Sequence, residues 1–219
     1  LAGVLFGASP EGVVFTMNAT HGLNLAIKSL VGPGDRVVIS GFEHNAVTRT
    51  LHSLEKDARA KVNVLPIQKD FSYDLEKIRE DFKAKNPDFV ICSYASNVCG
   101  LICPVQEIFE QAKNYDAITL TDIAQTAALV PLQVGSDLID YAVFAGHKTL
   151  YGPFGIAGFA KKRNLDLEPV LFGGTGVESA LQDMVERKQK RNSRKRKCRT
   201  SHTRRTFKPL RFYSHSWAI

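Results

Sequence analysis

The sequence has no long apolar run and few cysteines, and both absences exclude classes of protein. No window of its 219 residues approaches the roughly 18 consecutive apolar residues of a membrane-spanning helix, and the start lacks the basic leader of a secretory signal. The four cysteines include no CxxC pair and no Cys/His cluster of zinc spacing. We therefore expect a cytoplasmic protein with no membrane or metal site, in which Cys92, Cys99 and Cys103 are buried thiols.

An initial methionine and acidic residues at the C-terminal end are also missing. The first methionine is Met17, which suggests a fragment of a longer protein. Residues 187–219 contain 13 Lys and Arg and no Asp or Glu, so residues 1–186 hold 16 basic against 22 acidic side chains. The net charge of +7 therefore combines a body of about −6 with a tail of +13. We predict a folded domain over residues 1–178 and a disordered basic tail over 179–219.

The body alternates between short apolar, β-branched runs and longer amphipathic ones. With 44% hydrophobic residues, this pattern predicts an α/β fold with a mainly parallel sheet wrapped by helices. Leu75, Ile78 and Phe82 fall on one face of a predicted helix, and another helix follows Pro104. The predicted strands are residues 13–16, 36–39, 62–65, 88–92, 118–121 and 141–144.

Two of these strands are followed by an acid and an amine. Asp122 comes directly after strand 118–121, and Lys148, 26 positions later, follows the last strand. Pyridoxal phosphate needs an amine to hold its aldehyde as a Schiff base and a carboxylate to pair with its pyridine nitrogen. A lysine taken alone would be a solvated surface charge. In order with Asp122, Gln125 and His44, Lys148 instead indicates a pyridoxal phosphate site.

Further polar side chains follow the other strands, where open parallel sheets bind ligands. Thr20 and His21 open a helix whose N–H groups and positive end could hold a phosphate, although Thr20 could also be a simple N-cap. His44 could lie flat on an aromatic ring or be an ordinary residue at a helix start. Asn97 lies in a stretch that could be only a turn. Gln125 could donate a hydrogen bond to the ring's phenolic oxygen.

The order of these motifs resembles the class V aminotransferase family of the aspartate aminotransferase fold. Within that family it is most similar to the cysteine desulfurases and selenocysteine lyases. The resemblance covers residues 1 to about 178 and implies the large domain of a pyridoxal phosphate-dependent transferase, in incomplete form. The matching stretches are residues 18–24, 43–47, 96–100, 122–126, 146–148, 151–156 and 173–176.

The resemblance assigns roles around the cofactor ring. It implies that Lys148 forms the Schiff base and that Asp122 pairs with the pyridine nitrogen. Gln125 and Asn97 would lie around the ring oxygen and the substrate amine. His44 would stack on the ring and could move protons.

The resemblance also implies a phosphate site. Thr20 and His147 would contact the phosphate, and Thr175 would reach the phosphate of a partner subunit, which implies a homodimer. His21 follows Thr20 where many relatives have an acidic residue, and we include it among the cofactor-binding residues. Ala145 stands where many relatives carry a hydroxyl residue.

The implied function is that of a pyridoxal phosphate-dependent enzyme acting on cysteine or selenocysteine, most closely a cysteine desulfurase that passes sulfur through a persulfide to an acceptor protein. We find no C-terminal domain with the persulfide cysteine and the carboxylate-binding arginine after Thr175, so we expect this fragment to be inactive as a desulfurase. Cys198 has basic neighbours that would lower its pKa, but none of the family's surroundings. An aminotransferase or another lyase of this fold remains an alternative.

The basic tail has three interpretations. It could bind nucleic acid in a salt-dependent way, which would make the chain a nucleic-acid-binding protein, or it could be a solvated run without a partner. We prefer a third hypothesis, a shifted reading frame, because the family pattern stops near residue 178 and the composition changes abruptly there. The hypothesis is wrong if no single-base shift in the DNA restores a family-like continuation.

Overall fold

The computed structural model describes residues 6–132, 134, 137–162 and 167–171, all within the compact unit Leu1–Phe172. Thr175, Cys198 and the predicted tail lie outside the described residues. The described strands are β1 (Val13–Thr16), β2 (Asp35–Ile39), β3 (Ala60–Val64), β4 (Phe89–Ser93), β5 (Ile118–Asp122), β6 (Tyr141–Ala145) and β7 (Ala157–Lys161). The helices are the 3-10 turn η1 (Pro10–Gly12) and α2 (Ala19–Leu30), α3 (Asn45–Lys56), α4 (Leu75–Lys85) and α5 (Val105–Lys113).

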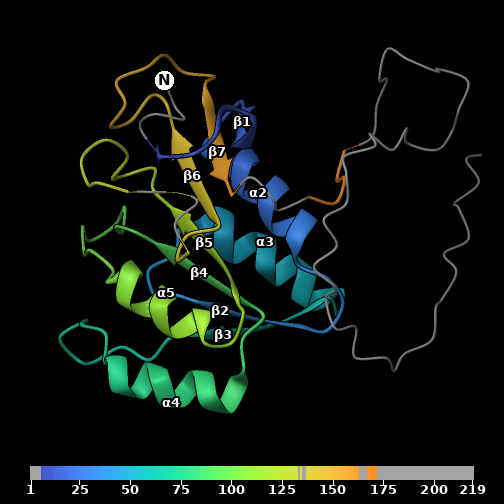
Figure 1. Ribbon diagram of the computed structural model, residues 1–219, viewed down its shortest axis with the longest axis vertical. Helices are drawn as coiled ribbons and strands as arrows, with labels where there is room; N and C mark the ends of the chain where they lie inside the picture. Colours follow the sequence, from blue (N-terminus) through green and yellow to red (C-terminus); the bar gives the residue numbers. More distant parts are fainter. Residues whose placement is uncertain (1–5, 133, 135–136, 163–166, 172–219) are drawn as a thin grey trace, which may run out of the picture. The chain divides into compact units, whose positions relative to one another are not determined.

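The strands form one sheet in the order β1-β7-β6-β5-β4-β2-β3 (Figure 1). Strands β2 to β6 pair in parallel, whereas β7 is antiparallel to both β6 and β1. The predicted α/β fold is thus confirmed, and all six predicted strands occur with ends shifted by no more than two residues. Within the described part of the chain, no helix is both long and apolar enough to cross a bilayer.

Strand β7 is missing from the sequence prediction. Its residues are mostly Ala and Gly, which have low strand propensity. A Cβ on Gly158 would lie 2.3 Å from the Val14 carbonyl oxygen, so a glycine is needed where β1 and β7 approach each other. The strand therefore forms because its backbone completes the sheet, and not because its side chains favour an extended conformation.

Two apolar cores cover the two faces of the sheet. Helices α2 and α3 pack on one face and α4 and α5 on the other (Figure 1). Successive residues of one strand point to opposite faces. In β2, Val37 and Ile39 belong to the core under α2 and α3, and Val38 belongs to the core under α4 and α5. Burial on both faces explains why the central strands are apolar throughout. The sheet is thus a rigid platform whose carboxyl edge can position functional side chains.

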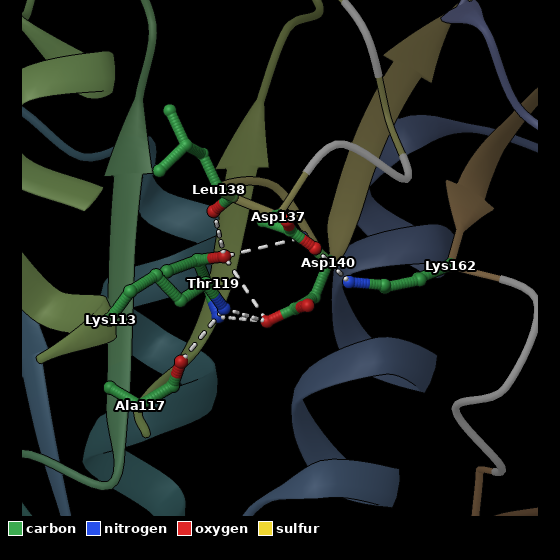
Figure 2. A network of polar contacts seen from close by, with 7 residues as sticks. All are labelled: Lys113, Ala117, Thr119, Asp137, Leu138, Asp140 and Lys162. Atoms are coloured by element: carbon green, nitrogen blue, oxygen red, sulfur yellow. Dashed lines mark hydrogen bonds and ion pairs between the residues drawn. The ribbon is translucent and has the colours of Figure 1, made fainter. Parts of the chain in front are cut away.

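A buried polar network holds the opposite, amino-terminal edge of the sheet (Figure 2). Asp140, which is 6% exposed, accepts hydrogen bonds from Lys113 Nζ and from the Thr119 N–H at 2.9 Å. Lys113 also donates to the Ala117 carbonyl at 2.9 Å, and the Thr119 hydroxyl donates to the Leu138 carbonyl at 2.5 Å. The network joins β5, the start of β6 and the end of α5.

Replacing Asp140 with alanine should lower the free energy of unfolding by about 3 kcal/mol, because Lys113 and the Thr119 N–H lose a largely buried partner. Urea unfolding measures the loss. Asp137→Ala is the matched control, because its ion pair with Lys162 is exposed, and it should cost less than about 1 kcal/mol. Equal losses in the two variants would contradict this account of the network.

Candidate active site

The carboxyl ends of the parallel strands bring most of the predicted functional residues to one edge of the sheet. His44 follows β2, Asn97 follows β4, Asp122 ends β5 and Lys148 follows β6. Because β2, β4, β5 and β6 are parallel neighbours in the sheet, their carboxyl ends open on the same side.

Asp122 is the buried centre of this edge. It is 8% exposed, and its Oδ1 accepts a hydrogen bond from the Ala124 N–H at 2.9 Å. Burial raises the pKa of Asp122, while the Ala124 N–H and the nearby Lys148 and His44 side chains oppose that shift. Two of the other predicted residues, Lys148 and His44, therefore lie within electrostatic reach of Asp122.

Backbone hydrogen bonds fix the loop that carries Lys148. The Gly146 N–H donates to the Ile156 carbonyl at 2.9 Å, and the Gly152 N–H donates to the Gly146 carbonyl at 2.7 Å. A Cβ on Gly146 would lie 2.5 Å from the Ile156 carbonyl oxygen, so only glycine allows this closure. The Tyr151 N–H closes a turn on the Lys148 carbonyl at 3.0 Å. Lys148 is thus a half-buried residue on a constrained loop.

The start of α2 lies close to the sheet because Gly22 has no side chain. A Cβ at Gly22 would lie 3.2 Å from Val143 Cγ1 of β6. Asn18 caps the helix by accepting the His21 N–H at 2.8 Å, so the alternative that Thr20 is the N-cap is wrong. Thr20 is exposed and, with His44, lines a groove between α2 and α3. The helix start therefore presents N–H groups beside the predicted site.

The other predicted residues occupy more exposed positions. Gln125 is half-buried and directly follows Ala124, whose N–H binds Asp122, and the His147 ring stacks on Phe154 with centroids 4.7 Å apart. Asn97 is exposed on a turn, and that turn also exposes Cys99. The prediction that Cys99 is buried is therefore wrong, whereas Cys92 and Cys103 are buried as expected.

Glu43 is a residue of this site for which no role was predicted from the sequence. Its carboxylate accepts hydrogen bonds from Ser40 Oγ, from the Ser93 N–H at 2.6 Å and from Ser93 Oγ at 2.9 Å. The residue keeps some exposure, but its carboxylate is enclosed by protein atoms, and this burial raises the pKa of Glu43 to about 7. The neighbouring charge of Asp122 adds to the shift. An acidic residue beside His44 at a strand end was the only signal in the sequence.

Glu43 should make the chain without ligand less stable as the pH rises from about 4.5 to about 7. Its pKa is raised on folding, so the folded chain holds the proton more tightly than the unfolded chain over this range. The free energy of unfolding should therefore fall by roughly 3 kcal/mol from this group, and Asp122, whose pKa is also raised, acts in the same direction. Urea unfolding of the wild type and of Glu43→Gln at several pH values measures how much of the pH dependence comes from Glu43. If the free energy of unfolding depends on pH in the same way in both proteins, this contribution of Glu43 is refuted.

The arrangement fits pyridoxal phosphate. The buried carboxylate of Asp122, whose pKa is raised by burial, favours a cationic ligand group such as a protonated ring nitrogen. Lys148 supplies the amine, and His44 supplies a flat aromatic face. Among the described residues, His21 Nδ1 and Thr149 Oγ1 are buried polar atoms without a hydrogen-bond partner. His21 comes after β1 and Thr149 after β6, so both lie near the carboxyl ends of strands.

Comparisons with known proteins agree with this geometry. The sequence pattern of the class V aminotransferases matches residues 2–204. A probable cysteine desulfurase of Halalkalibacterium halodurans is 34% identical over 180 residues, which cover 80% of this chain and 44% of that protein. The apo cysteine desulfurase of Thermococcus onnurineus NA1 is 29% identical with a TM-score of 0.73, covering 79% of this chain and 44% of that one.

A solved structure of SspA in complex with cysteine is 27% identical with a TM-score of 0.70, covering 78% of this chain and 50% of that one. The chain thus spans half or less of the length of these relatives. The matched family, the shared fold and the residues at the carboxyl edge agree. This chain belongs to the class V aminotransferase family and is similar in sequence and fold to cysteine desulfurases.

Proposed function

We propose that this chain is part of a pyridoxal phosphate-dependent enzyme that acts on an amino acid, most closely a cysteine desulfurase. The observation that carries the proposal is the burial of Asp122 within electrostatic reach of Lys148 and His44. A buried carboxylate beside an amine and an imidazole has little structural purpose, because burial disfavours its charge. The same three groups are those that a pyridoxal ring would contact.

Each residue has a separate task in this proposal. When bound, the cofactor supplies an electron sink that lowers the barrier to breaking a bond at the substrate's α carbon. The Lys148 amine holds the cofactor, and Asp122 keeps a proton on the ring nitrogen. His44 covers one face of the ring and excludes water there. Gln125 donates to the ring oxygen.

The remaining residues of the proposed site bind the phosphate of the cofactor and the amine of the substrate. We assign the phosphate to Thr20, His21 and His147, with Thr175 reaching the phosphate of a second subunit, and we assign Asn97 to the substrate amine. A homodimer and a protein that accepts the sulfur are parts of the same proposal. The assignment of L-cysteine is supported by the names of the relatives and by the relative that was solved with cysteine.

The proposal is tested by adding pyridoxal phosphate to the purified chain and then adding each enantiomer of cysteine. One equivalent of cofactor should bind with a saturable visible absorbance, and L-cysteine should change that absorbance more than D-cysteine does. The enantiomers are needed because free cofactor reacts with both of them equally. Binding that does not saturate, or equal responses to the two enantiomers, would refute the proposed function.

A further inference from the structure

Glu43 joins the ends of two neighbouring strands at the candidate active site. It lies in the short segment between β2 and α3, where it accepts a hydrogen bond from Ser40 Oγ of the same segment. Its two carboxylate oxygens also accept from the N–H and the hydroxyl of Ser93, at 2.6 Å and 2.9 Å. Ser93 is the last residue of β4, which pairs with β2. The side chain therefore ties the segment after β2 to the end of β4.

The fixed end of this tie is the backbone beside Asp122. Ser93 pairs in register with Asp122 across the parallel β4–β5 ladder. The next residue, Tyr94, donates its N–H to the Asp122 carbonyl at 2.9 Å. The position of Ser93 relative to Asp122 is thus set by sheet hydrogen bonds.

The other end of the tie carries His44, the residue that follows Glu43. His44 is the N-cap of α3, and its Nδ1 accepts the Ala46 N–H at 3.0 Å. An Nδ1 that accepts a hydrogen bond carries no proton, so the proton of the neutral ring lies on Nε2. Anchoring Glu43 therefore restrains both the place of the imidazole and its tautomer.

We propose that Glu43 is a positioning residue that fixes the His44 imidazole relative to Asp122 and so prepares the face on which a flat aromatic cofactor lies. This inference rests on the proposed function and names a residue of the same site. The carboxylate does not serve stability, because its raised pKa means that its charge opposes folding near neutral pH. A group that lowers stability at a ligand site is better explained by a functional task.

The first test observes His44 in the chain without cofactor, by NMR of its imidazole nitrogens at a pH where the ring is neutral. Comparison with the spectrum of His44→Ala identifies the signals. The wild type and Glu43→Gln, which keeps an acceptor for the Ser93 N–H, should show a single tautomer with the proton on Nε2. Glu43→Ala should show a mixture of tautomers. Should Glu43→Ala fail to fold, Glu43→Asp, whose shorter side chain cannot reach Ser93, should show the same mixture.

The second test is a double-mutant cycle on the affinity for pyridoxal phosphate. Glu43→Ala should weaken binding about tenfold, because the His44 imidazole is no longer held in place for the ring, while Glu43→Gln stays close to the wild type. In a His44→Ala background, Glu43→Ala should change the affinity by less than about twofold, because Glu43 acts through His44. Asp140→Ala is the matched control, since it destabilises the opposite edge of the sheet without reaching the site.

Each outcome decides the inference. A single unchanged tautomer in Glu43→Ala, an equal loss of affinity in the two backgrounds, or a loss no larger than that of Asp140→Ala would overturn it. A wild type that binds no pyridoxal phosphate would refute the proposed function. The tautomer measurement would still decide whether Glu43 positions His44, so the two failures are distinguishable.

Discussion

Lys148→Ala should abolish covalent capture of pyridoxal phosphate by this chain, together with the visible absorbance of the captured cofactor. The loss should be complete, because the constrained loop places Lys148 within electrostatic reach of Asp122 and no other lysine in the described part of the chain affects that carboxylate. The measurement is the absorbance spectrum of the protein after free cofactor has been removed. The free energy of unfolding without cofactor should change little, since Lys148 is only half-buried.

Lys162→Ala is the control for adventitious reaction with surface amines. Lys162 pairs with the exposed Asp137 at the other edge of the sheet, so its loss should leave the spectrum unchanged. If Lys148→Ala keeps the absorbance of the wild type, or if both variants lose it to the same extent, Lys148 is not the amine that holds the cofactor.

Asp122→Asn should weaken cofactor binding roughly 10- to 100-fold and at the same time stabilise the chain without cofactor. The amide keeps an acceptor for the Ala124 N–H at the same place but removes the charge that would pair with the ring nitrogen, a loss of about 1.5–3 kcal/mol. It also removes the unfavourable burial that raises the pKa of Asp122. Titration with pyridoxal phosphate measures the first effect and urea unfolding measures the second.

Asp88→Asn is the matched control for Asp122→Asn. Asp88 forms an ion pair with Arg36 at 2.9 Å just before β4, at the amino-terminal edge of the sheet. Its amide variant should lose some stability and keep the wild-type affinity. Opposite signs of the two stability changes would support Asp122 as a functional carboxylate. A loss of stability in Asp122→Asn with unchanged affinity would show that it is structural.

Much of the fold could be predicted because the central strands are apolar on both faces. Their ends were marked by the change to polar residues, so Asp122 and Lys148 were recognisable as strand-end groups. Strand β7 was missed because Gly158 has a low strand propensity and is needed there only because β1 approaches so closely. Local sequence patterns indicate the conformation that a segment prefers by itself, whereas β7 is extended because it pairs with its neighbouring strands.

The parts of the site that could not be predicted depend on contacts between distant segments. Glu43 acquires its role from Ser93, 50 residues away in the sequence, and no local motif announces that pairing. The N-cap at Asn18 was missed because Thr20, two positions later, is also of a residue type that caps helices. Cys99 was expected in the core from its type, but a turn closed by the Gly100 N–H on the Ser96 carbonyl exposes it.

The most direct test of the account is to find which amine reacts. The wild-type chain is mixed with one equivalent of pyridoxal phosphate, reduced with borohydride, digested with a protease and analysed by mass spectrometry. We predict that the reduced cofactor is attached to Lys148 and that Asp122→Asn lowers that labelling. Labelling spread over several surface lysines, with Lys148 no more modified than Lys162, would contradict it.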